Sequence, residues 1–410
     1  MRILMTTRGS AGHLGPLTPF AHACLRAGHE VLVAAQAQMR DNVARAGLAF
    51  APTPDPPQDE WMPLMAQFGR LDIDTANARM VGEFFAGIDV RAALPALRTI
   101  VEAWRPDVIV RETCDFAGPL VAELYGIPLV RVGIGLERFE ELAIAIAASA
   151  VDDARAQIGL AADPAGDRLR ETPYFTVVPE ALEHPRIAAP VDAQRFAEPM
   201  PEPGASAGDD AGTLPDWWPG NDDPLVYLTF GSVAAGAHLP YFPALYRAAI
   251  DELAPLPVRI LMTIGADRDH AELGPLPGNV HVERWVAHDL VARHAAVVVG
   301  HGGYGTTLGT LRLGVPLVVA PLFSADQWGN AAAVATAGAG LALDAERATR
   351  PVLGLPGAGT LAELAVAVRR VLEDPSFRQG AQRVAGAMRE LPPVDDAVDA
   401  LEALAARPVA

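Results

Sequence analysis

The chain has 410 residues, of which half are hydrophobic and 20% are charged, a balance typical of a folded protein long enough for two domains. Acidic residues outnumber basic ones 50 to 32, and the net charge of −18 argues against nucleic acid or an anionic membrane surface as a partner. The two cysteines, Cys24 and Cys114, cannot form a disulfide framework and match no metal spacing, so we expect a reducing cytoplasm. No stretch has 18 uncharged apolar residues, so no integral membrane association is expected.

Strand-like runs alternate with helical spacing from the first residues onward. The N-terminal apolar run ends at Arg8, and we interpret it as a first strand and not a signal peptide. The alternation predicts a parallel sheet that is covered by helices on both faces. The expected strands of the first half are RILMTT (2–7), EVLVAA (30–35), DVIVRE (107–112) and PLVRVG (128–133).

The turn after the first strand, TTRGSAGHLGPL, places His13 where a general base would be useful. Its imidazole titrates near neutral pH, and the alternative is a helix-capping histidine. Glu112 and Asp115 follow the strand at 107–112. Either carboxylate could orient the imidazole, and either could be a solvated turn residue.

Residues 55–105 form a less regular stretch that is rich in Met, Phe and Pro. An apolar insertion after an early strand could line a pocket for a hydrophobic ligand, and ordinary core is the equally weighted alternative. The candidate acceptor-binding residues in this stretch are Phe68, Phe84 and Phe85.

The alternation breaks between about residues 185 and 223, where Pro, Gly, Asp and Ala dominate as in a linker. We therefore expect two facing doubly wound α/β domains, with ligands in the cleft at the carboxyl ends of the strands. The expected strands of the second half are PLVYLTFG (224–231), VRILMTIG (258–265), VHVERWV (280–286), AAVVVGHG (295–302) and PLVVAP (316–321).

The stretch VVVGHGGYGTTLGTL (297–311) joins a buried strand to a helix through a glycine-rich turn. Bare N–H groups at such a helix start favour an anion, above all a phosphate. The P-loop lysine and the dinucleotide glycine spacing are both missing. His301 is therefore the expected side-chain donor to a phosphate, with Thr306 and Thr307 as hydroxyl donors.

Two further stretches of the second half carry candidate ligand contacts. Trp285 closes VHVERWV, and an indole at a strand end can stack on a planar base, although a single Trp is more often core. Asp326 and Gln327 follow another strand and could read vicinal hydroxyls, or could simply begin a helix.

Taken in order, these pieces resemble the nucleotide-sugar glycosyltransferases of the GT-B fold, in particular the bacterial branch that decorates antibiotics and other natural products. The resemblance runs nearly end to end. Its motifs are Gly12–His13, RAGHEV (26–31), RPDVIV (105–110), LTFGS (228–232), Trp285, HGGYGTT (301–307), LGVPLVVAP (313–321) and the DQ pair at 326–327.

The resemblance implies an acceptor-binding domain at 1–195, a linker at 196–223, a donor-binding domain at 224–385, and a C-terminal helix at 386–410 that packs back on the first domain. It also implies transfer of a hexose from a UDP- or TDP-sugar to a hydroxyl of a polyketide, macrolide or flavonoid-like acceptor, with inversion and without a metal or other cofactor. His13 would be the base, supported by Glu112 or Asp115. The implied donor-binding residues are Ser232, Trp285, Val286, His301, Gly303, Thr306, Thr307, Asp326 and Gln327.

The chain departs from the family pattern after Trp285, where WVAH stands in place of Trp-x-Pro-Gln. Base and ribose recognition, including uridine versus thymidine, is left open by this change. A sugar-nucleotide epimerase of the same fold and a non-catalytic partner of another transferase are the alternatives. The expected partners are small-molecule donor and acceptor, with the protein a monomer or a homodimer.

Overall fold

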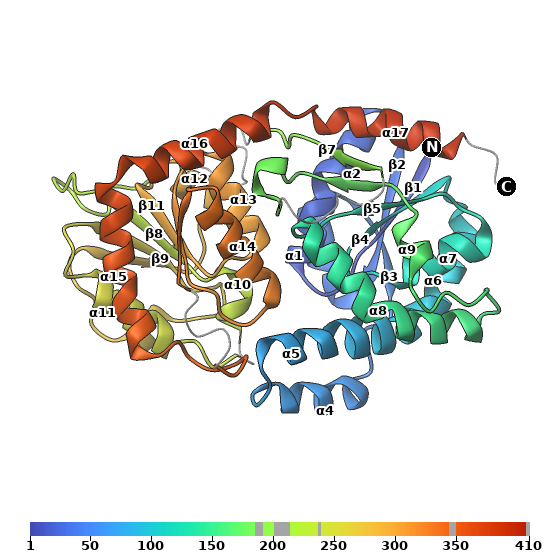
Figure 1. The fold of residues 1–410 in the computed structure, drawn as a ribbon, viewed down its shortest axis with the longest axis horizontal. Helices are drawn as coiled ribbons and strands as arrows, with labels where there is room; N and C mark the ends of the chain where they lie inside the picture. Colours follow the sequence, from blue (N-terminus) through green and yellow to red (C-terminus); the bar gives the residue numbers. More distant parts are fainter. Residues whose placement is uncertain (185–191, 201–213, 237–238, 344–349, 407–410) are drawn as a thin grey trace.

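The computed structural model describes residues 1–184, 192–200, 214–236, 239–343 and 350–406. Within this part of the chain, two domains lie side by side, each built on a wholly parallel sheet (Figure 1). No helix of the described residues is both long and apolar enough to cross a membrane.

The first domain contains a sheet of seven strands in the order β3-β2-β1-β4-β5-β6-β7. Its central strands are buried on both faces, as the apolar runs predict. Ile3 and Met5 point to one apolar cluster and Leu4 to another, because successive side chains of a strand alternate. The strands are β1 (Arg2–Thr6), β2 (Glu30–Gln36), β3 (Ala49–Thr53), β4 (Val108–Glu112), β5 (Leu129–Val132), β6 (Tyr174–Thr176) and β7 (Ala193–Arg195).

The helices of the first domain include one segment of unusual geometry, the ten-residue π-helix η3. It continues directly into α6, and its wider turn is a form often found at functional sites. The helices are α1 (Ala11–Leu14), η1 (Gly15–Leu17), α2 (Thr18–Arg26), η2 (Ala37–Met39), α3 (Arg40–Arg45), α4 (Gln58–Phe68), α5 (Ile73–Arg79), η3 (Met80–Asp89), α6 (Val90–Trp104), α7 (Ala117–Tyr125), α8 (Glu137–Gln157), α9 (Asp167–Arg170) and η4 (Glu180–Leu182).

The second domain contains a sheet of six strands in the order β10-β9-β8-β11-β12-β13. Trp217 and Trp218, which precede its first strand, pack against this domain. The strands are β8 (Leu225–Thr229), β9 (Arg259–Thr263), β10 (Val280–Glu283), β11 (Val297–Gly300), β12 (Leu317–Val319) and β13 (Gly340–Ala342). The helices are α10 (Gly231–Ala234), α11 (Ala244–Leu253), η5 (His270–Leu273), α12 (His288–Ala292), α13 (Tyr304–Arg312), α14 (Ala325–Thr336), α15 (Ala358–Glu373) and α16 (Pro375–Arg389). The chain then continues through η6 (Val394–Asp396) and α17 (Ala397–Ala405), which contact the first domain.

The C-terminal helices tie the two domains together. Helix α16 lies along the second domain and α17 along the first, so the chain crosses back over both (Figure 1). The crossing is held by a backbone bond of 2.7 Å from the N–H of Ala197 to the carbonyl of Pro392. The returning segment therefore begins a few residues after α16 ends at Arg389, and residues 407–410 of the expected helix lie outside the described part.

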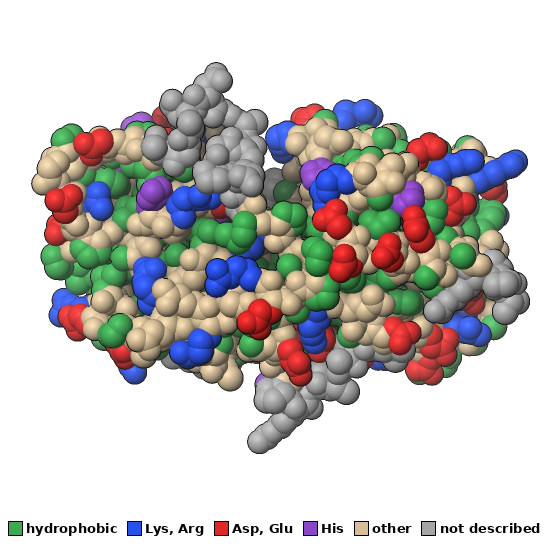
Figure 2. All heavy atoms as spheres, turned by 90° about the horizontal axis from the view of Figure 1, so that it is seen from above, with side chains coloured by type: hydrophobic (Ala, Val, Ile, Leu, Met, Phe, Trp, Pro, Cys, Tyr) green, Lys and Arg blue, Asp and Glu red, His purple; other side chains and the backbone are tan. Residues whose placement is uncertain are grey.

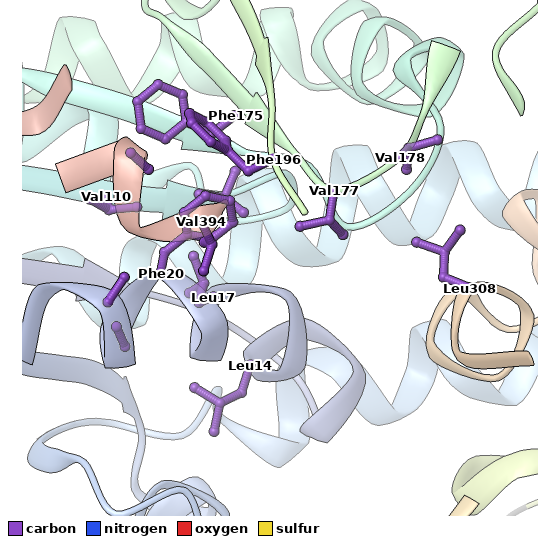
Figure 3. Packing of buried hydrophobic residues seen from close by; sticks show 14 of the residues in the cluster. Leu14, Leu17, Phe20, Val110, Phe175, Val177, Val178, Phe196, Leu308 and Val394 are labelled. Carbon is purple, nitrogen blue, oxygen red and sulfur yellow. The ribbon is translucent and has the colours of Figure 1, made fainter. Parts of the chain in front are cut away.

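A single apolar cluster continues from the first domain into the second. Figure 3 shows Val394 beside Leu17 and Phe20, with Leu308 of α13 directed toward Val178. Helix α13 follows the glycine-rich turn, so the helix that carries the expected phosphate donors packs directly on the first domain. Residues 201–213 of the expected linker are outside the described part of the chain.

The surface agrees with the acidic composition. Figure 2 shows acidic and basic side chains interspersed over one face, with carboxylates denser over the first domain. Interspersed charge of this kind offers no continuous basic track for a nucleic-acid backbone on this face.

Candidate active site

His13 and Glu112 form a hydrogen-bonded pair at the carboxyl ends of two adjacent strands, and we call this pair the dyad. His13 lies on α1, which Ser10 caps by accepting a bond from the backbone of residue 12. Its Nδ1 is 3.1 Å from Oε1 of Glu112, the last residue of β4. The buried carboxylate also accepts backbone N–H bonds from Arg8 at 3.2 Å and from Cys114 at 2.6 Å.

The contacts of Glu112 favour one tautomer of His13. Both side-chain oxygens of Glu112 act as acceptors of backbone N–H groups, so the oxygen that faces Nδ1 accepts the Nδ1–H of His13 and leaves Nε2 with its lone pair. Burial lowers the pKa of His13, but Glu112, followed by Asp326 and Asp89, raises it, and the net pKa lies above the ordinary value of 6.5. The imidazole is 19% exposed, so it remains accessible from the cleft.

The side-chain contacts of Asp115 are with Arg8 and Gly118, and it is Glu112 that bonds His13. Its carboxylate lies 3.3 Å from Nε of Arg8 and accepts the N–H of Gly118 at 3.2 Å. The side chain is fully buried, so these two partners occupy it. Glu112 is the acid that contacts the imidazole.

Phe85 and Phe84, both on η3, lie beside the dyad. The Phe85 ring centroid is 5.4 Å from the His13 ring, and Phe84 is 5.3 Å from Phe85 with the rings edge to face. Both phenylalanines are partly exposed. Phe68 is different, because it is only 5% exposed and packs in the cluster that contains Trp328 of α14. Phe68 thus forms core between the domains, and its expected contact with a bound acceptor is not supported.

His301 lies at the glycine-rich turn between β11 and α13. Its ring is 7% exposed and sits between two glycines, because a Cβ at Gly231 would lie 2.6 Å from Cε1 and one at Gly303 would lie 2.5 Å from Nε2. Burial lowers the pKa of His301 to about 4, so the ring is neutral near pH 7. Its Nδ1 is buried and has no hydrogen-bond partner among the described residues.

A second unpaired polar atom lies in the first turn of α13. The hydroxyl of Thr307 is buried without a partner in the described structure, and Gly303 precedes the helix without a side-chain cap. Thr306 is partly buried and Ser232 of α10 is exposed. Buried polar groups normally have partners, so the unpaired atoms and the free N–H groups of the helix start mark a site for an anion.

Trp285 lies just beyond the end of β10 and is 67% exposed. An indole this exposed is available to stack on a planar ligand, which a core tryptophan is not. The neighbouring Val286 is partly buried and packs on the second domain. His288, which replaces the family glutamine, bonds Thr310 Oγ1 through Nε2 at 3.1 Å, and burial lowers its pKa to about 4.

Asp326 and Gln327 begin α14, on the opposite side of the cleft from the dyad. Gln327 is 2% exposed, and its side-chain oxygen accepts the backbone N–H groups of Leu322 at 2.8 Å and Phe323 at 3.1 Å. Only its amide NH₂ is left to donate to a ligand. Asp326 accepts a hydrogen bond from the Ser324 hydroxyl. Burial raises the pKa of Asp326, and Ser324 and then His13 of the other domain act to lower it.

Three residues that shape the site were missed by sequence reasoning. Arg8 contacts the carboxylates of Asp89 and Asp115, Asp89 is the last residue of the π-helix η3, and Asn330 donates to the carbonyl of Gly302 at 2.8 Å. The available signals were a charged residue directly after a buried strand and a single acid in the apolar run GIDV. Neither signal predicts the hydrogen-bond and ion-pair partners of these residues, because the partners lie on elements distant in the chain.

One group of the described residues has the donor types of a metal site, namely His13, Glu112 and Cys114, with ligand atoms within 4.8 Å of one another. Burial, followed by the charge of Glu112, raises the pKa of the Cys114 thiol well above its ordinary value. A protonated thiol is a poor metal ligand, and Glu112 already accepts three hydrogen bonds. Reaction without a metal therefore stays our prediction.

The chain matches known proteins along most of its length. The N-terminal domain model of erythromycin biosynthesis protein CIII-like proteins matches residues 22–171, and the C-terminal domain model matches residues 247–404. The L-demethylnoviosyl transferase of Streptomyces niveus is 33% identical over 348 residues, which cover 84% of this chain and 85% of that protein. Elloramycin glycosyltransferase ElmGT of Streptomyces olivaceus is 31% identical over 412 residues, with 96% and 94% covered.

Solved structures give the same answer. The glycosyltransferase SsfS6 of Streptomyces sp. SF2575, complexed with thymidine diphosphate, superposes with a TM-score of 0.73 at 27% identity, and the match covers 98% of this chain and 99% of that one. Together with the two parallel-sheet domains, this similarity confirms the expected GT-B fold. The chain therefore belongs to the erythromycin biosynthesis protein CIII-like family and is a bacterial natural-product glycosyltransferase, an enzyme that transfers a sugar to an aglycone.

Proposed function

We propose that this enzyme transfers a hexose from a TDP-sugar to a hydroxyl of a hydrophobic natural product, with inversion and without a metal. The observation that carries the proposal is the dyad, bonded at 3.1 Å on one side of the cleft, with the unpaired Nδ1 of His301 on the other domain. The relatives support the nucleotide, since one is named as a TDP-daunosamine transferase and SsfS6 is complexed with thymidine diphosphate.

The first step of the proposed reaction is activation of the acceptor. The acceptor hydroxyl donates its proton to Nε2 of His13, and Glu112 stabilises the imidazolium that forms. The acceptor oxygen then forms a bond to the anomeric carbon as the bond from that carbon to the diphosphate breaks. A single displacement from the face opposite the leaving group inverts the anomeric configuration.

The second requirement is to stabilise the diphosphate as it leaves. Neutral His301 donates one N–H, the Thr307 hydroxyl and the free N–H groups of α13 supply further donors, and Thr306, Ser232 and Gly303 lie beside them. Preorganised donors of this kind act most strongly where water is excluded. They also offset the repulsion between an anionic donor and a protein of net charge −18.

Recognition of the two substrates follows from the same cleft. The partly exposed rings of Phe84 and Phe85 favour a flat or apolar acceptor beside His13. Trp285 is available for the base, with Val286 next to it. Sugar hydroxyls would donate to the Asp326 carboxylate and accept from the Gln327 amide.

The test is a transfer assay with the purified chain. TDP- and UDP-linked glucose and rhamnose are each incubated with a panel of hydroxylated polyketide, macrolide and flavonoid aglycones, with and without a chelator. We expect a β-product from an α-linked donor, unaffected turnover in chelator, and loss of most transfer in His13→Ala with TDP binding retained. Retained configuration, or His13→Ala turnover near that of the wild type, would overturn the mechanism. An epimerised sugar formed without an acceptor would instead support the epimerase alternative.

A further inference from the structure

Arg8 is a buried arginine that gathers several elements behind the dyad. It follows β1 and is 1% exposed. Its Nε lies 3.3 Å from the carboxylate of Asp89 and 3.3 Å from that of Asp115, and its Nη1 donates to Thr53 Oγ1 at 2.9 Å. One side chain thus contacts the last residue of β3, the turn after β4 and the last residue of the π-helix.

These contacts connect the acceptor side of the cleft to the base. Asp89 ends η3, the helix that carries Phe84 and Phe85, and is itself held by the Gln36 amide at 2.9 Å. Arg8, which pairs with Asp89, also donates its backbone N–H to the Glu112 carboxylate of the dyad at 3.2 Å. We call Phe84 and Phe85 the aromatic wall. A displacement of Arg8 would therefore disturb both the aromatic wall and the orientation of His13.

The charges around Arg8 are unbalanced without it. Glu112, Asp89 and Asp115 place three carboxylates behind His13, and Arg8 is in ionic contact with two of them. Burial raises the pKa of Asp89 and Arg8 lowers it, while Asp115 and Glu112 raise it further. Of these three carboxylates, Glu112 and Asp89 raise the pKa of His13, as does Asp326 of the other domain, and that pKa is already above the ordinary value. Loss of the guanidinium would increase this negative field.

We propose that Arg8 is a positioning residue that fixes the aromatic wall and the dyad relative to each other, and so sets the acceptor affinity as well as the turnover. The inference rests on the proposed function, in which His13 is the base and η3 lines the acceptor site. Arg8 touches no reacting atom, and its action passes through Asp89 and Glu112.

Three substitutions separate the geometric effect from the charge effect. Arg8→Lys keeps a charge but cannot bridge Asp89, Asp115 and Thr53 with one ammonium group, so the acceptor KM should rise roughly tenfold with little change in the pKa of His13. Arg8→Met should raise the acceptor KM as well and raise the pKa of His13, because it removes the positive charge that lies beside Asp89. Asp89→Asn should raise the acceptor KM and lower the pKa of His13, because it removes a negative charge. The donor KM should stay within about twofold throughout.

The experiment combines kinetics with NMR. The acceptor KM, donor KM and kcat are measured with the donor and aglycone that turn over in the panel, and the pKa of His13 is followed in histidine-labelled enzyme, with the resonance assigned by its loss in His13→Ala. Arg155→Met is the matched control. Arg155 is a buried arginine on α8, and its carboxylate partner, Glu123 of α7, lies at 2.6 Å. It should lose stability and leave the acceptor KM and the His13 resonance unchanged.

The outcomes distinguish this inference from the proposed function. Loss of the wild-type transfer reaction, or normal turnover in His13→Ala, contradicts the proposed function. If the wild-type enzyme transfers the sugar but the acceptor KM is unchanged in both Arg8→Lys and Asp89→Asn, only the role of Arg8 is overturned. The NMR measurement needs no acceptor, so a His13 pKa that stays fixed in Arg8→Met, or moves the same way in Arg8→Met and Asp89→Asn, also overturns it. If Arg8→Met does not fold, the other two substitutions still decide.

Discussion

Replacing Glu112 by Gln should disable the dyad while changing its volume very little. Oε1 of Glu112 meets two groups, the N–H of Arg8 at 3.2 Å and Nδ1 of His13 at 3.1 Å, and Oε2 accepts the N–H of Cys114 at 2.6 Å. A glutamine has one oxygen, so its NH₂ must face one of these positions. Facing Cys114, it opposes a donor. Facing His13, it donates to Nδ1 and forces the proton onto Nε2, the atom that should act as the base.

Both outcomes have a magnitude that can be estimated. A base in the wrong tautomer costs about a hundred- to ten-thousand-fold in kcat. A buried donor that faces another donor costs about 1–3 kcal/mol in the free energy of unfolding. The pKa of His13 should fall, because the largest upward contribution, the charge of Glu112, is removed.

The assay is the pH dependence of kcat/KM with the donor and acceptor held fixed. A base must be deprotonated to act, so the wild-type rate should rise with pH through a midpoint above 6.5, the pKa of His13 being raised. In Glu112→Gln this midpoint should move to lower pH while the plateau falls. Asp115→Asn is the control, because that acid pairs with Arg8 and should leave the midpoint where it is. A Glu112→Gln enzyme with at least half the wild-type plateau and an unmoved midpoint would refute the reasoning.

Three further outcomes are expected. Gly303→Ala puts a Cβ only 2.5 Å from His301 Nε2 and should weaken TDP binding at least tenfold by calorimetry, because the ring must move. Gly305→Ala, with open space around its Cβ, should bind like wild type. Trp285→Ala should weaken TDP binding by about 1–3 kcal/mol through lost stacking, with no change in melting temperature, since the indole is exposed. Leu401→Ala should lower the free energy of unfolding by about 2–5 kcal/mol in denaturant titrations, because this buried side chain anchors α17 to the first domain. Unchanged binding or stability in the matching measurement would contradict each.

The alternation of strands and helices could be predicted because long apolar runs bounded by Gly and Pro are local signals. The strands that escaped are β3, which contains a proline, and β6, β7 and β13, each of three residues. Strands this short take their pairing from neighbours, and their own sequence carries little periodicity. The π-helix η3 could not be predicted either, since its main neighbour is α8, an element distant in the chain, and its own sequence carries no signal for i→i+5 bonding.

The candidate site was predictable in its residue types and not in its pairings. Glu112 and Asp115 end the same stretch of chain, and from sequence either could support His13. The choice is made by Arg8, which pairs with Asp115 and presents only its backbone N–H to Glu112. Phe68 and Phe84 look equivalent in the apolar insertion, yet Phe68 is buried in the cluster between the domains, whereas Phe84 packs against that cluster and stays partly exposed beside Phe85. Both distinctions depend on contacts between elements far apart in the chain.

His13, which follows Gly12, and His301, which lies between Gly300 and Gly302, differ in environment in the way that their two proposed tasks require. His13 is next to Glu112 and within the field of Asp89 and Asp326, and its pKa is raised, so its proton affinity suits a base. Burial alone acts on His301 and lowers its pKa to about 4, so its ring is neutral at the pH where His13 titrates. A protonated His301 would bind the diphosphate product more tightly and slow its release. In the proposed reaction, a neutral His301 would hold the diphosphate through hydrogen bonds, and His13 would be the only one of the two imidazoles to change charge, as it takes the acceptor proton.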